Sequence, residues 1–461
     1  MRDDPLTPKN GLNGPPAKVG ISIRLDKPMD AHKNTSRLSA AASKSAVLVS
    51  TNADSGEKQD IMTTRAVLVI SGRQFWVSHI VIWLLIGFCS GQTSTASHSR
   101  SSASAETKTD TTWSQFHRPN MTRWNKYENT LNVTNVGNLV LEWSFYVGEG
   151  NDVLSGPAMN NGRVVAGSGN GSVYALDAAT GAELWDFQTG GAAYSSPAIA
   201  NGVVYINSVG YENNLFALDA KTGRQLWVYA VPVNYVTYSS PAVVNGVVYV
   251  GLGDTNVYAL DAKTGTKIWS YTTGGPVSSS PAVANGMVYF CSDQMYALNA
   301  STGSLVWSYA FGGSNASPAI ANGVVYVASG DGVVYALDAK TGSKVWSYAI
   351  GGYVDSSAAV TNEAVYVGSG DTYVYALDIR SGTPFWAYKT GGSVESSPAV
   401  ANGVVYVTSD DFFLYALHAR TGALLWSQSA GYYGNPPTVA SGVVYAGSTY
   451  DSRINAYGLN K

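Results

Sequence analysis

The chain has 461 residues, of which 45% are hydrophobic and only 13% are charged, about half the charged fraction of an ordinary soluble domain. Its 49 glycines and 30 tyrosines, against 11 phenylalanines, favour tightly turned β-structure and disfavour a helical enzyme. Residues 127–461 carry 12 Lys and Arg against 22 Asp and Glu. Because such an acidic surface repels phosphates and anionic lipid headgroups, we expect no nucleic-acid binding and no basic membrane patch.

The N-terminal part of the chain differs in character from the rest. Residues 1–61 are polar and lack sustained periodicity, which predicts a disordered segment or an extension upstream of the true start. Residues 62–91 have the pattern of a secretory signal, because two arginines precede an apolar run at 75–89 that small and polar residues follow. The alternative is a retained membrane anchor, although this run is short for a span. Residues 92–111 are rich in Ser and Thr and predict a flexible linker.

The predicted signal implies export to the periplasm, the cell surface or the extracellular space. We expect contact with a membrane only through this N-terminal segment, and only if it stays uncleaved.

One motif recurs along the remainder of the chain. It is written SSPAIANGVVYINS at 195–208 and recurs with few changes at 239–252, 279–292 and 396–409. Each repeat closes with a tryptophan, and these are Trp143, Trp185, Trp227, Trp269, Trp307, Trp346, Trp386 and Trp426. A fixed period of about forty residues is typical of repeat architectures.

Each repeat predicts four short strands. An Asn-Gly pair, such as Asn201-Gly202, favours a tight hairpin between the first two strands because both residues tolerate positive φ. A Gly- and Asp-rich turn, as at 328–332, precedes the third strand, and a Lys-Thr-Gly turn leads to the fourth. Four strands with no helix between them predict a blade of a β-propeller, whose radial closure removes exposed sheet edges.

The number of blades follows from the repeats. Seven complete repeats run from Pro157 to Trp426, and the chain then supplies three strands of an eighth. The missing outer strand is predicted at 139–145, around Trp143. The fold class is therefore all-β: an eight-bladed β-propeller of four-stranded antiparallel blades over residues 112–461, closed by an N-terminal strand that completes the last blade.

The turn before the fourth strand has a specific spacing, Ala-x-Asp-x-x-Thr-Gly-x-x-x-Trp, as in ALDAKTGSKVW at 336–346. This motif resembles the tryptophan-docking motif of the quinoprotein-like eight-bladed propellers, although Asn299 and His418 replace the Asp in two repeats. The resemblance implies a fold shared by alcohol dehydrogenases that use pyrroloquinoline quinone with calcium and by non-enzymatic propellers such as the lipoprotein of the outer-membrane β-barrel assembly machine. It implies a fold and leaves the function open.

One column varies from repeat to repeat while its neighbours stay nearly constant. It lies three residues before the proline position of the first strand and reads Leu154, Tyr194, Tyr238, Ser278, Asn315, Asp355, Glu395 and Gly434. Because innermost strands line the channel of a propeller, we expect this column at the channel mouth. Tyr353 and Tyr432 stand two residues earlier in their repeats and point the same way by strand alternation.

These columns hold the candidate site residues. Asn315, Asp355 and Glu395 fall on successive blades and offer oxygen ligands for a hard cation such as calcium, so they are the candidates for holding a cofactor. The alternative is that polar residues at a wet channel mouth need no ligand. The candidate ligand-binding residues are Tyr194, Tyr238, Tyr353 and Tyr432.

The turns between the second and third strands carry further acidic or amide residues, expected on the same face. They are Asn170, Glu212, Asp254, Asp293, Asp331, Asp371, Asp410, Asp411 and Asp451. Their summed field favours polar or cationic ligands, although Asp and Asn are also common turn residues for structural reasons.

No catalytic residue is predicted. Dehydrogenases of the resembled family commonly have an adjacent cysteine pair over the cofactor, whereas this propeller has only Cys291, expected to be buried and inert. His117 and His418 have no visible partner for nucleophilic catalysis. We therefore expect an exported, non-catalytic binding or assembly scaffold without a cofactor, whose protein partner or small polar or cationic ligand binds at the channel mouth. The alternative is a dehydrogenase of alcohols or sugars that depends on pyrroloquinoline quinone and calcium.

Overall fold

A computed structural model divides the chain into two units, residues 1–102 and 103–461. It describes residues 67–70, 73–76, 112–118, 121–149, 151–210, 213–232, 235–432 and 434–460. In the first unit, β1 (Val67–Ile70) pairs antiparallel with β2 (Arg73–Trp76). The rest of the predicted extension and export segment, and all of the predicted linker, lie outside the described residues. Within those residues, no helix is both long and apolar enough to cross a membrane.

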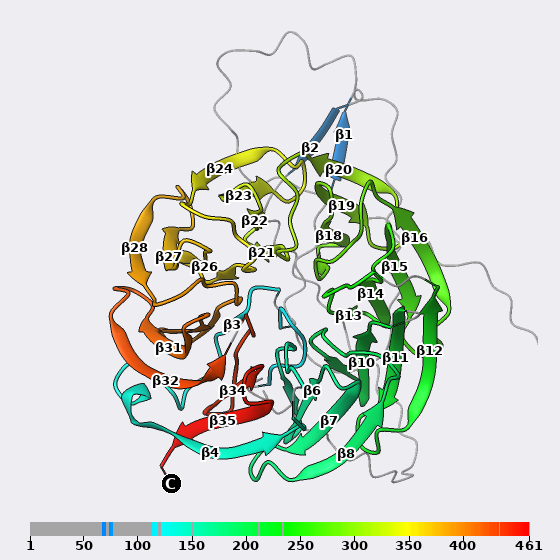
Figure 1. Cartoon of the computed structure of the whole chain (residues 1–461). Coiled ribbons are helices and arrows are strands. Elements are labelled where there is room, and N and C mark those ends of the chain that lie inside the picture. Colours follow the sequence, from blue (N-terminus) through cyan, green and yellow to red (C-terminus); the bar gives the residue numbers. More distant parts are fainter. Residues whose placement is uncertain are drawn as a thin grey trace, which may run out of the picture. The chain divides into compact units, whose positions relative to one another are not determined.

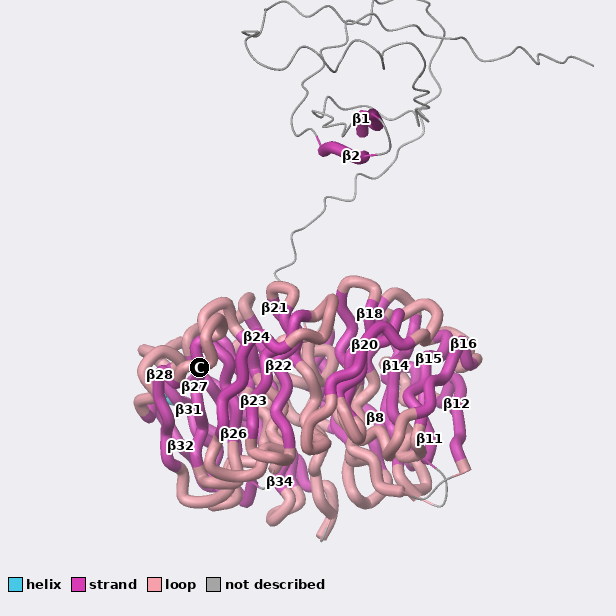
Figure 2. Tube along the Cα trace, turned by 90° about the horizontal axis from the view of Figure 1, so that it is seen from above, coloured by secondary structure: helices cyan, strands magenta, loops and turns pink. Residues whose placement is uncertain are grey.

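The second unit is an eight-bladed β-propeller, as predicted. Its described strands form eight sheets around a central channel (Figure 1), and the strands run between the two faces of the ring (Figure 2). Blades 1 to 7 take four consecutive strands each, from β5–β8 to β29–β32, and blade 8 consists of β33–β35 with β4.

The strands occupy equivalent positions in every blade. The innermost strands are β5 (Ala158–Asn160), β9 (Ala198–Ala200), β13 (Ala242–Val244), β17 (Ala282–Ala284), β21 (Ala319–Ala321), β25 (Ala359–Val360), β29 (Ala399–Ala401) and β33 (Thr438–Ala440). The second strands are β6 (Arg163–Gly167), β10 (Val203–Ser208), β14 (Val247–Gly251), β18 (Met287–Cys291), β22 (Val324–Ser329), β26 (Ala364–Gly368), β30 (Val404–Thr408) and β34 (Val443–Ser448). The third strands are β7 (Ser172–Asp177), β11 (Asn213–Asp219), β15 (Asn256–Asp261), β19 (Met295–Asn299), β23 (Val333–Asp338), β27 (Tyr373–Asp378), β31 (Phe412–His418) and β35 (Arg453–Leu459). The outermost strands are β8 (Glu183–Gln188), β12 (Gln225–Val231), β16 (Lys267–Thr272), β20 (Leu305–Tyr309), β24 (Lys344–Ala349), β28 (Pro384–Lys389), β32 (Leu424–Tyr432) and, for blade 8, β4 (Leu139–Tyr146), which the 3-10 helix η1 (Val136–Asn138) precedes.

The core lies between neighbouring blades, and the pattern of each strand follows from that position. The second and third strands are buried on both faces, so they have continuous apolar runs, whereas outer strands such as β16 alternate exposed and buried residues. The inner hairpins turn on the predicted Asn-Gly pairs: Asn201 and Gly202 have φ angles of 50° and 78°. Both residues therefore adopt the positive φ that a two-residue hairpin of the favoured hand requires.

The tryptophans dock each blade on the next. In blade 3, Nε1 of Trp269 donates to the carbonyl oxygen of Ala300 at 2.9 Å, and its ring lies against Gly303. A second donor escaped prediction: the hydroxyl of Tyr249, on the second strand of the same blade, donates to the same carbonyl at 3.2 Å. The rings of Tyr249 and Trp269 pack with centroids 5.9 Å apart. The motif turn therefore presents one carbonyl and one glycine to a pair of aromatic side chains.

The two departures from the docking motif keep its geometry. In the regular turn, Oδ1 of Asp338 accepts a hydrogen bond from the N–H of Thr341 at 2.8 Å. Oδ1 of Asn299 accepts the equivalent N–H at 3.0 Å, and Nδ1 of His418 accepts the N–H of Arg420 at 3.1 Å. Both replacements are therefore hydrogen-bond acceptors that hold the turn.

The predicted closure is confirmed. β4 pairs antiparallel with β35, with Trp143 opposite Ala456. Docking continues across this seam, because Nε1 of Trp426 in blade 7 donates to the carbonyl of Leu139 at 3.2 Å. Nε1 of Trp143 in turn donates to the carbonyl of Ala178 in blade 1 at 3.0 Å. An N-terminal strand thus completes the last blade and joins both ends of the array.

A segment before β4 crosses one end of the channel, beside the turns between first and second strands. This crossing segment comprises residues 113–118 and 121–125 and includes β3 (Trp124–Asn125), which pairs parallel with β29. It forms hydrogen bonds with seven of the eight blades, at Met159, Ile199, Val243, Ile320, Val360, Val400 and Val439. The buried guanidinium of Arg123 donates to four carbonyl oxygens, those of Phe116, Ser397, Pro398 and Pro437. The segment therefore bonds to the inner strands from within the ring.

Candidate functional site

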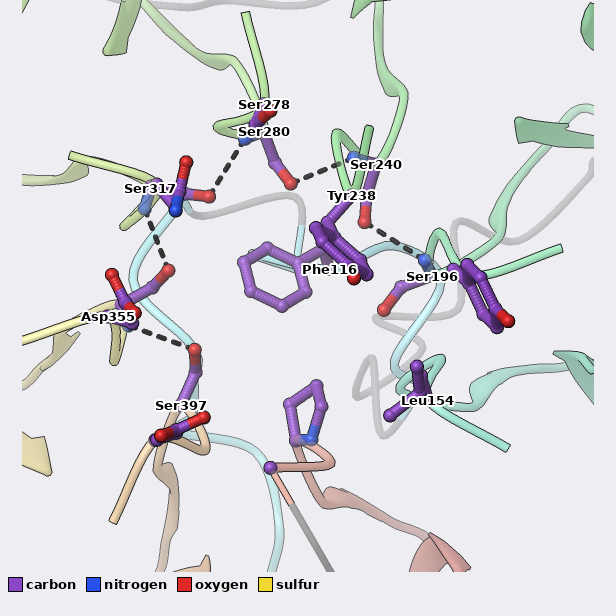
Figure 3. Close-up of a pocket in the computed structure, with 16 residues that line it drawn as sticks. Phe116, Leu154, Ser196, Tyr238, Ser240, Ser278, Ser280, Ser317, Asp355 and Ser397 are labelled. Atoms are coloured by element: carbon purple, nitrogen blue, oxygen red, sulfur yellow. Dashed lines mark hydrogen bonds between the residues drawn. The ribbon is translucent and has the colours of Figure 1, made fainter. Parts of the chain in front are cut away.

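The channel contains a cavity of about 320 Å³, which the crossing segment borders at its base (Figure 3). All eight residues of the variable column line it, from Leu154 around the ring to Gly434. Deeper in the channel the lining consists of six serines, Pro436 and the ring of Phe116, which comes from the crossing segment. The cavity therefore has a wall that differs from blade to blade above a nearly uniform base.

The six serines form an arc of hydrogen bonds around this base, from blade 1 to blade 7. The N–H of Ser196 donates to Oγ of Ser240 at 3.0 Å, and equivalent bonds link blades 1 to 7 in order. The other bonds, at 2.8–2.9 Å, join Gly156 to Ser196, Ser240 to Ser280, Ser280 to Ser317, Ser317 to Ser357 and Ser357 to Ser397. In blades 2 to 7, each variable residue lies two positions before its serine, on the same side of an extended chain. The serine arc therefore fixes where the variable side chains of these blades stand.

The wall of the cavity is chemically divided. Blades 1 to 3 contribute Leu154, Tyr194 and Tyr238, and the two tyrosine rings lie 6.1 Å apart. Blades 6 and 7 contribute the carboxylates of Asp355 and Glu395 on another part of the wall, after Ser278 and Asn315. No lysine, arginine or histidine is among the described residues that line the cavity. The site therefore combines an aromatic side with an acidic side that has no cationic partner in its lining.

The acidic side is electrostatically strained. Burial, and then the charge of Glu395, raise the pKa of Asp355 above its ordinary value. Burial, with repulsion from Glu395 and Asp411, raises the pKa of Asp410 to about 6. The hydroxyl of Tyr353 donates to Oε1 of Glu395 at 2.6 Å, and this bond, with burial, raises the pKa of Tyr353 to about 12. A cation at this wall would relieve the repulsion.

The predicted site residues divide into three groups. Asn315, Asp355 and Glu395 line the cavity, as do Tyr194 and Tyr238 on the opposite side. Tyr353 lies outside the lining but bonds to Glu395. Tyr432 belongs to β32, and its side chain is not described. Among the described residues, no three His, Cys, Asp or Glu side chains come together in a way that would hold a metal ion.

Most residues of the acidic turns have a structural role. Oδ1 of Asp371 accepts the N–H of Tyr373 at 3.1 Å, and Oδ2 accepts the hydroxyl of Tyr375 at 2.7 Å. Asp254, Asp331 and Asp411 make the same pair of bonds to the residues two and four positions later. Glu212 lies outside the described residues. Asp410 and Asp451 differ, because Oδ1 of each is buried and no described group bonds to it. The carboxylate of Asp451 lies beside the guanidinium of Arg453, whereas Glu395 is an acidic neighbour of Asp410. Repeat comparison could have identified Asp410, since glycines Gly330 and Gly370 stand at its position in blades 5 and 6.

The other reactive side chains are buried or used in turns. His117 lies in the crossing segment, where burial and then the charge of Arg123 lower its pKa to about 3. It is therefore neutral at physiological pH and a poor general base. Cys291 is fully buried, and burial raises the pKa of its thiol. His418 holds a docking turn. None of these three groups lines the cavity.

A comparison with known protein families agrees with the propeller architecture. A family model described as outer membrane protein assembly factor BamB matches residues 106–292, 254–353 and 349–460. The chain belongs to this family. No curated protein sequence matches it.

Solved structures of several propellers share the fold of this BamB-family chain. BamB from Moraxella catarrhalis is 20% identical, with a TM-score of 0.60 over 70% of this chain and 100% of that one. The quinohemoprotein alcohol dehydrogenase ADHIIG from Pseudomonas putida HK5 is 18% identical, with a TM-score of 0.67 over 76% and 80%. That from Comamonas testosteroni is 16% identical, with a TM-score of 0.68 over 77% and 82%. Since this similarity is at the level of the fold, function depends on the site.

Proposed function

We propose that this chain is an exported, non-catalytic scaffold that binds a partner at the channel mouth. The observation that carries the proposal is the cavity, where the residues that differ between otherwise similar blades meet above a constant base. A packing role would favour the same residue in every blade, so variation at this column points to recognition. Membership of the BamB family supports an assembly role, and the apolar run at 75–89 supports export.

The cavity does not fit the cofactor of the alternative function. Pyrroloquinoline quinone is a polycarboxylate, and a site for it requires positive charge or many N–H donors. The described lining instead presents the carboxylates of Asp355 and Glu395 without a lysine or arginine. Without a bridging cation these groups would repel the cofactor, and the described residues hold no cluster of three His, Cys, Asp or Glu side chains for such a cation, so we derive no redox step for this site.

A photo-cross-linking amino acid in place of Tyr238 tests the proposal. In the cell envelope or medium of the native source, this variant should form a discrete adduct with one partner. The matched control carries the cross-linker at Ile268, which is exposed on the outer strand β16, and should form no such adduct. Equal adducts at both positions, or none at Tyr238, would contradict the proposal.

The enzymatic alternative has a separate test. The purified chain, supplied with pyrroloquinoline quinone and calcium, should not reduce an electron-accepting dye when alcohols or sugars are added. Substrate-dependent reduction that is lost in Asp355→Asn would establish the dehydrogenase instead.

A further inference from the structure

We infer that the cavity receives the side chain of an arginine or lysine from a partner polypeptide, while the adjoining chain of that partner packs on an aromatic pair at the rim. This inference rests on the proposed function, because it names the chemistry of the partner at the same site. Four features of the described residues carry it: the size of the cavity, its divided wall, an unusual turn in blade 7 and the exposed aromatic pair.

The size and wall of the cavity match one long cationic side chain. Its volume of about 320 Å³ is near the lower end of ligand cavities, which span roughly 300–1,000 Å³. A guanidinium or ammonium group would face the carboxylates of Asp355 and Glu395, which share this wall without a cationic neighbour in the described lining. The aliphatic stem would lie against Tyr194 and Tyr238 and above Phe116, since such stems pack well on aromatic surfaces.

The turn of blade 7 extends the acidic wall from the cavity to the rim. Where blade 5 has the sequence Ser-Gly-Asp-Gly at 329–332, blade 7 has Ser-Asp-Asp-Phe at 409–412. The extra carboxylate of Asp410 is repelled by Glu395 and accepts the N–H of Gly434, while its Oδ1 has no partner among the described groups. In blades 5 and 6 a glycine stands at this position. An asparagine would accept the same N–H without the repulsion, so folding alone does not explain Asp410.

Phe412 is also unfavourable for folding. Its φ of 72° matches the 79° of Gly332 in blade 5, a conformation that a bulky side chain adopts only at a conformational cost. Its ring is 44% exposed and lies 5.7 Å from the ring of Tyr450 in blade 8, which is 81% exposed. We call these two residues the rim pair. The rim pair contributes little to the core, but it offers an apolar contact beside the acidic wall.

The position of the rim pair distinguishes a polypeptide from a small amine. Neither ring is part of the cavity lining, so a ligand confined to the cavity would not use them. A polypeptide would use both, since its basic side chain enters the cavity while its neighbouring residues reach the rim. Tyrosine and arginine are among the residues that most often dominate the binding energy of protein interfaces.

A pool of dye-labelled heptapeptides tests the inference by fluorescence anisotropy with the full chain. The centre is arginine and the other positions are random neutral residues; a second pool has the neutral isostere citrulline at the centre. We expect the arginine pool to bind at least tenfold more tightly than the citrulline pool. Glu395→Gln and Asp355→Asn should each reduce that preference at least fivefold, whereas Asp186→Asn, on the outer strand β8, should leave it unchanged.

The rim pair has its own matched variants. Phe412→Gly removes an unfavourable φ but gives the unfolded chain more freedom, so it should melt close to the parent, yet it should weaken binding of the arginine pool severalfold. Thr372→Gly relieves the same φ in blade 6, at 78°, without removing an aromatic ring, and should leave binding unchanged. Free arginine amide, which reaches only the cavity, should bind Phe412→Gly and the parent equally.

The outcomes separate this inference from the proposed function. Equal binding of both pools, or no effect of Glu395→Gln and Asp355→Asn in variants that melt like the parent, would overturn it. Arginine amide that binds as tightly as the pool would make a small cation the ligand and overturn the polypeptide assignment. If a partner still cross-links at Tyr238 in these cases, the proposed function stands and only the ligand chemistry is wrong.

Discussion

At the scale of single residues, the glycines of the docking turns are constrained by both conformation and contact. Gly303 has a φ of 71°, and a Cβ built there would lie 2.7 Å from the ring of Trp269. Gly246 has a similar φ of 78° but faces open space. These two positions separate the conformational cost of a side chain from its steric cost.

We predict that Gly303→Ala destabilises the fold more than Gly246→Ala does. Both variants carry the penalty of positive φ, about 1–2 kcal/mol for a residue with a Cβ. Only Gly303→Ala also displaces the docked ring, which adds roughly 1–3 kcal/mol of overpacking. Urea unfolding of the two variants measures the difference, and equal losses would show that the ring has room to move.

The stability of the fold should also depend on the ionisation of Asp410. Its pKa is about 6 in the fold against 3.8 ordinarily, because burial and the charges of Glu395 and Asp411 oppose ionisation. The folded state therefore holds the proton more tightly, so this group stabilises the fold fully at low pH, and that stability is lost as the pH rises through about 6.

The substitution Asp410→Asn should remove this loss of stability at high pH. We predict that it melts above the parent at about pH 7.5 and close to the parent at about pH 3.5, as measured by circular dichroism. A difference in melting temperature that is the same at both pH values would mean that the carboxylate of Asp410 is not destabilised by its neighbours.

At the scale of elements, the crossing segment depends on Arg123. Burial lowers the pKa of this guanidinium to about 9, so it remains charged at neutral pH although the acceptors of its four hydrogen bonds are neutral carbonyl oxygens. The guanidinium carbon of Arg123 also lies 4.6 Å from the centroid of the Phe116 ring. This contact supports Phe116 at the base of the cavity.

We predict that Arg123→Met lowers the free energy of unfolding by about 2–5 kcal/mol, because several buried carbonyls lose a charged donor. It should also weaken binding at the cavity, since Phe116 loses its support. Chemical unfolding, together with anisotropy using the arginine pool, tests both effects. Parent-like stability would mean that water or another donor replaces the guanidinium.

Sequence reasoning predicted most elements because the chain repeats. The Asn-Gly turns, the tryptophan spacing and the variable column each appear many times, so one repeat tests another. The crossing segment occurs once, and Asn125 bonds to Val439, which is 314 residues away, so no local pattern reveals it. Asp410 does not stand out among the turn acids in the sequence, because only the fold shows that most of them accept local hydrogen bonds while Oδ1 of Asp410 accepts none.

At the scale of the whole molecule, closure of the ring should govern stability. Deleting residues 112–147 removes the crossing segment and β4, so blade 8 keeps three strands and loses Trp143. Loss of one large buried aromatic residue alone costs about 3–5 kcal/mol, and typical domains are stable by roughly 5–15 kcal/mol. The open strand edge also favours aggregation.

We therefore predict that this deletion is insoluble or melts far below the parent, whereas deletion of residues 1–61 leaves the melting curve unchanged. Thermal melting of the soluble fractions provides the comparison. Equal stability of the two truncations would contradict closure through β4.

Competition at the channel mouth shows directly whether this mouth binds a basic partner. The cross-linker is placed at Tyr238, and the adduct with the native partner is measured with arginine-centred or citrulline-centred heptapeptides in excess. We predict that the arginine pool abolishes the adduct and that the citrulline pool leaves most of it. An adduct that persists equally with both pools would show that the channel mouth does not bind a basic partner.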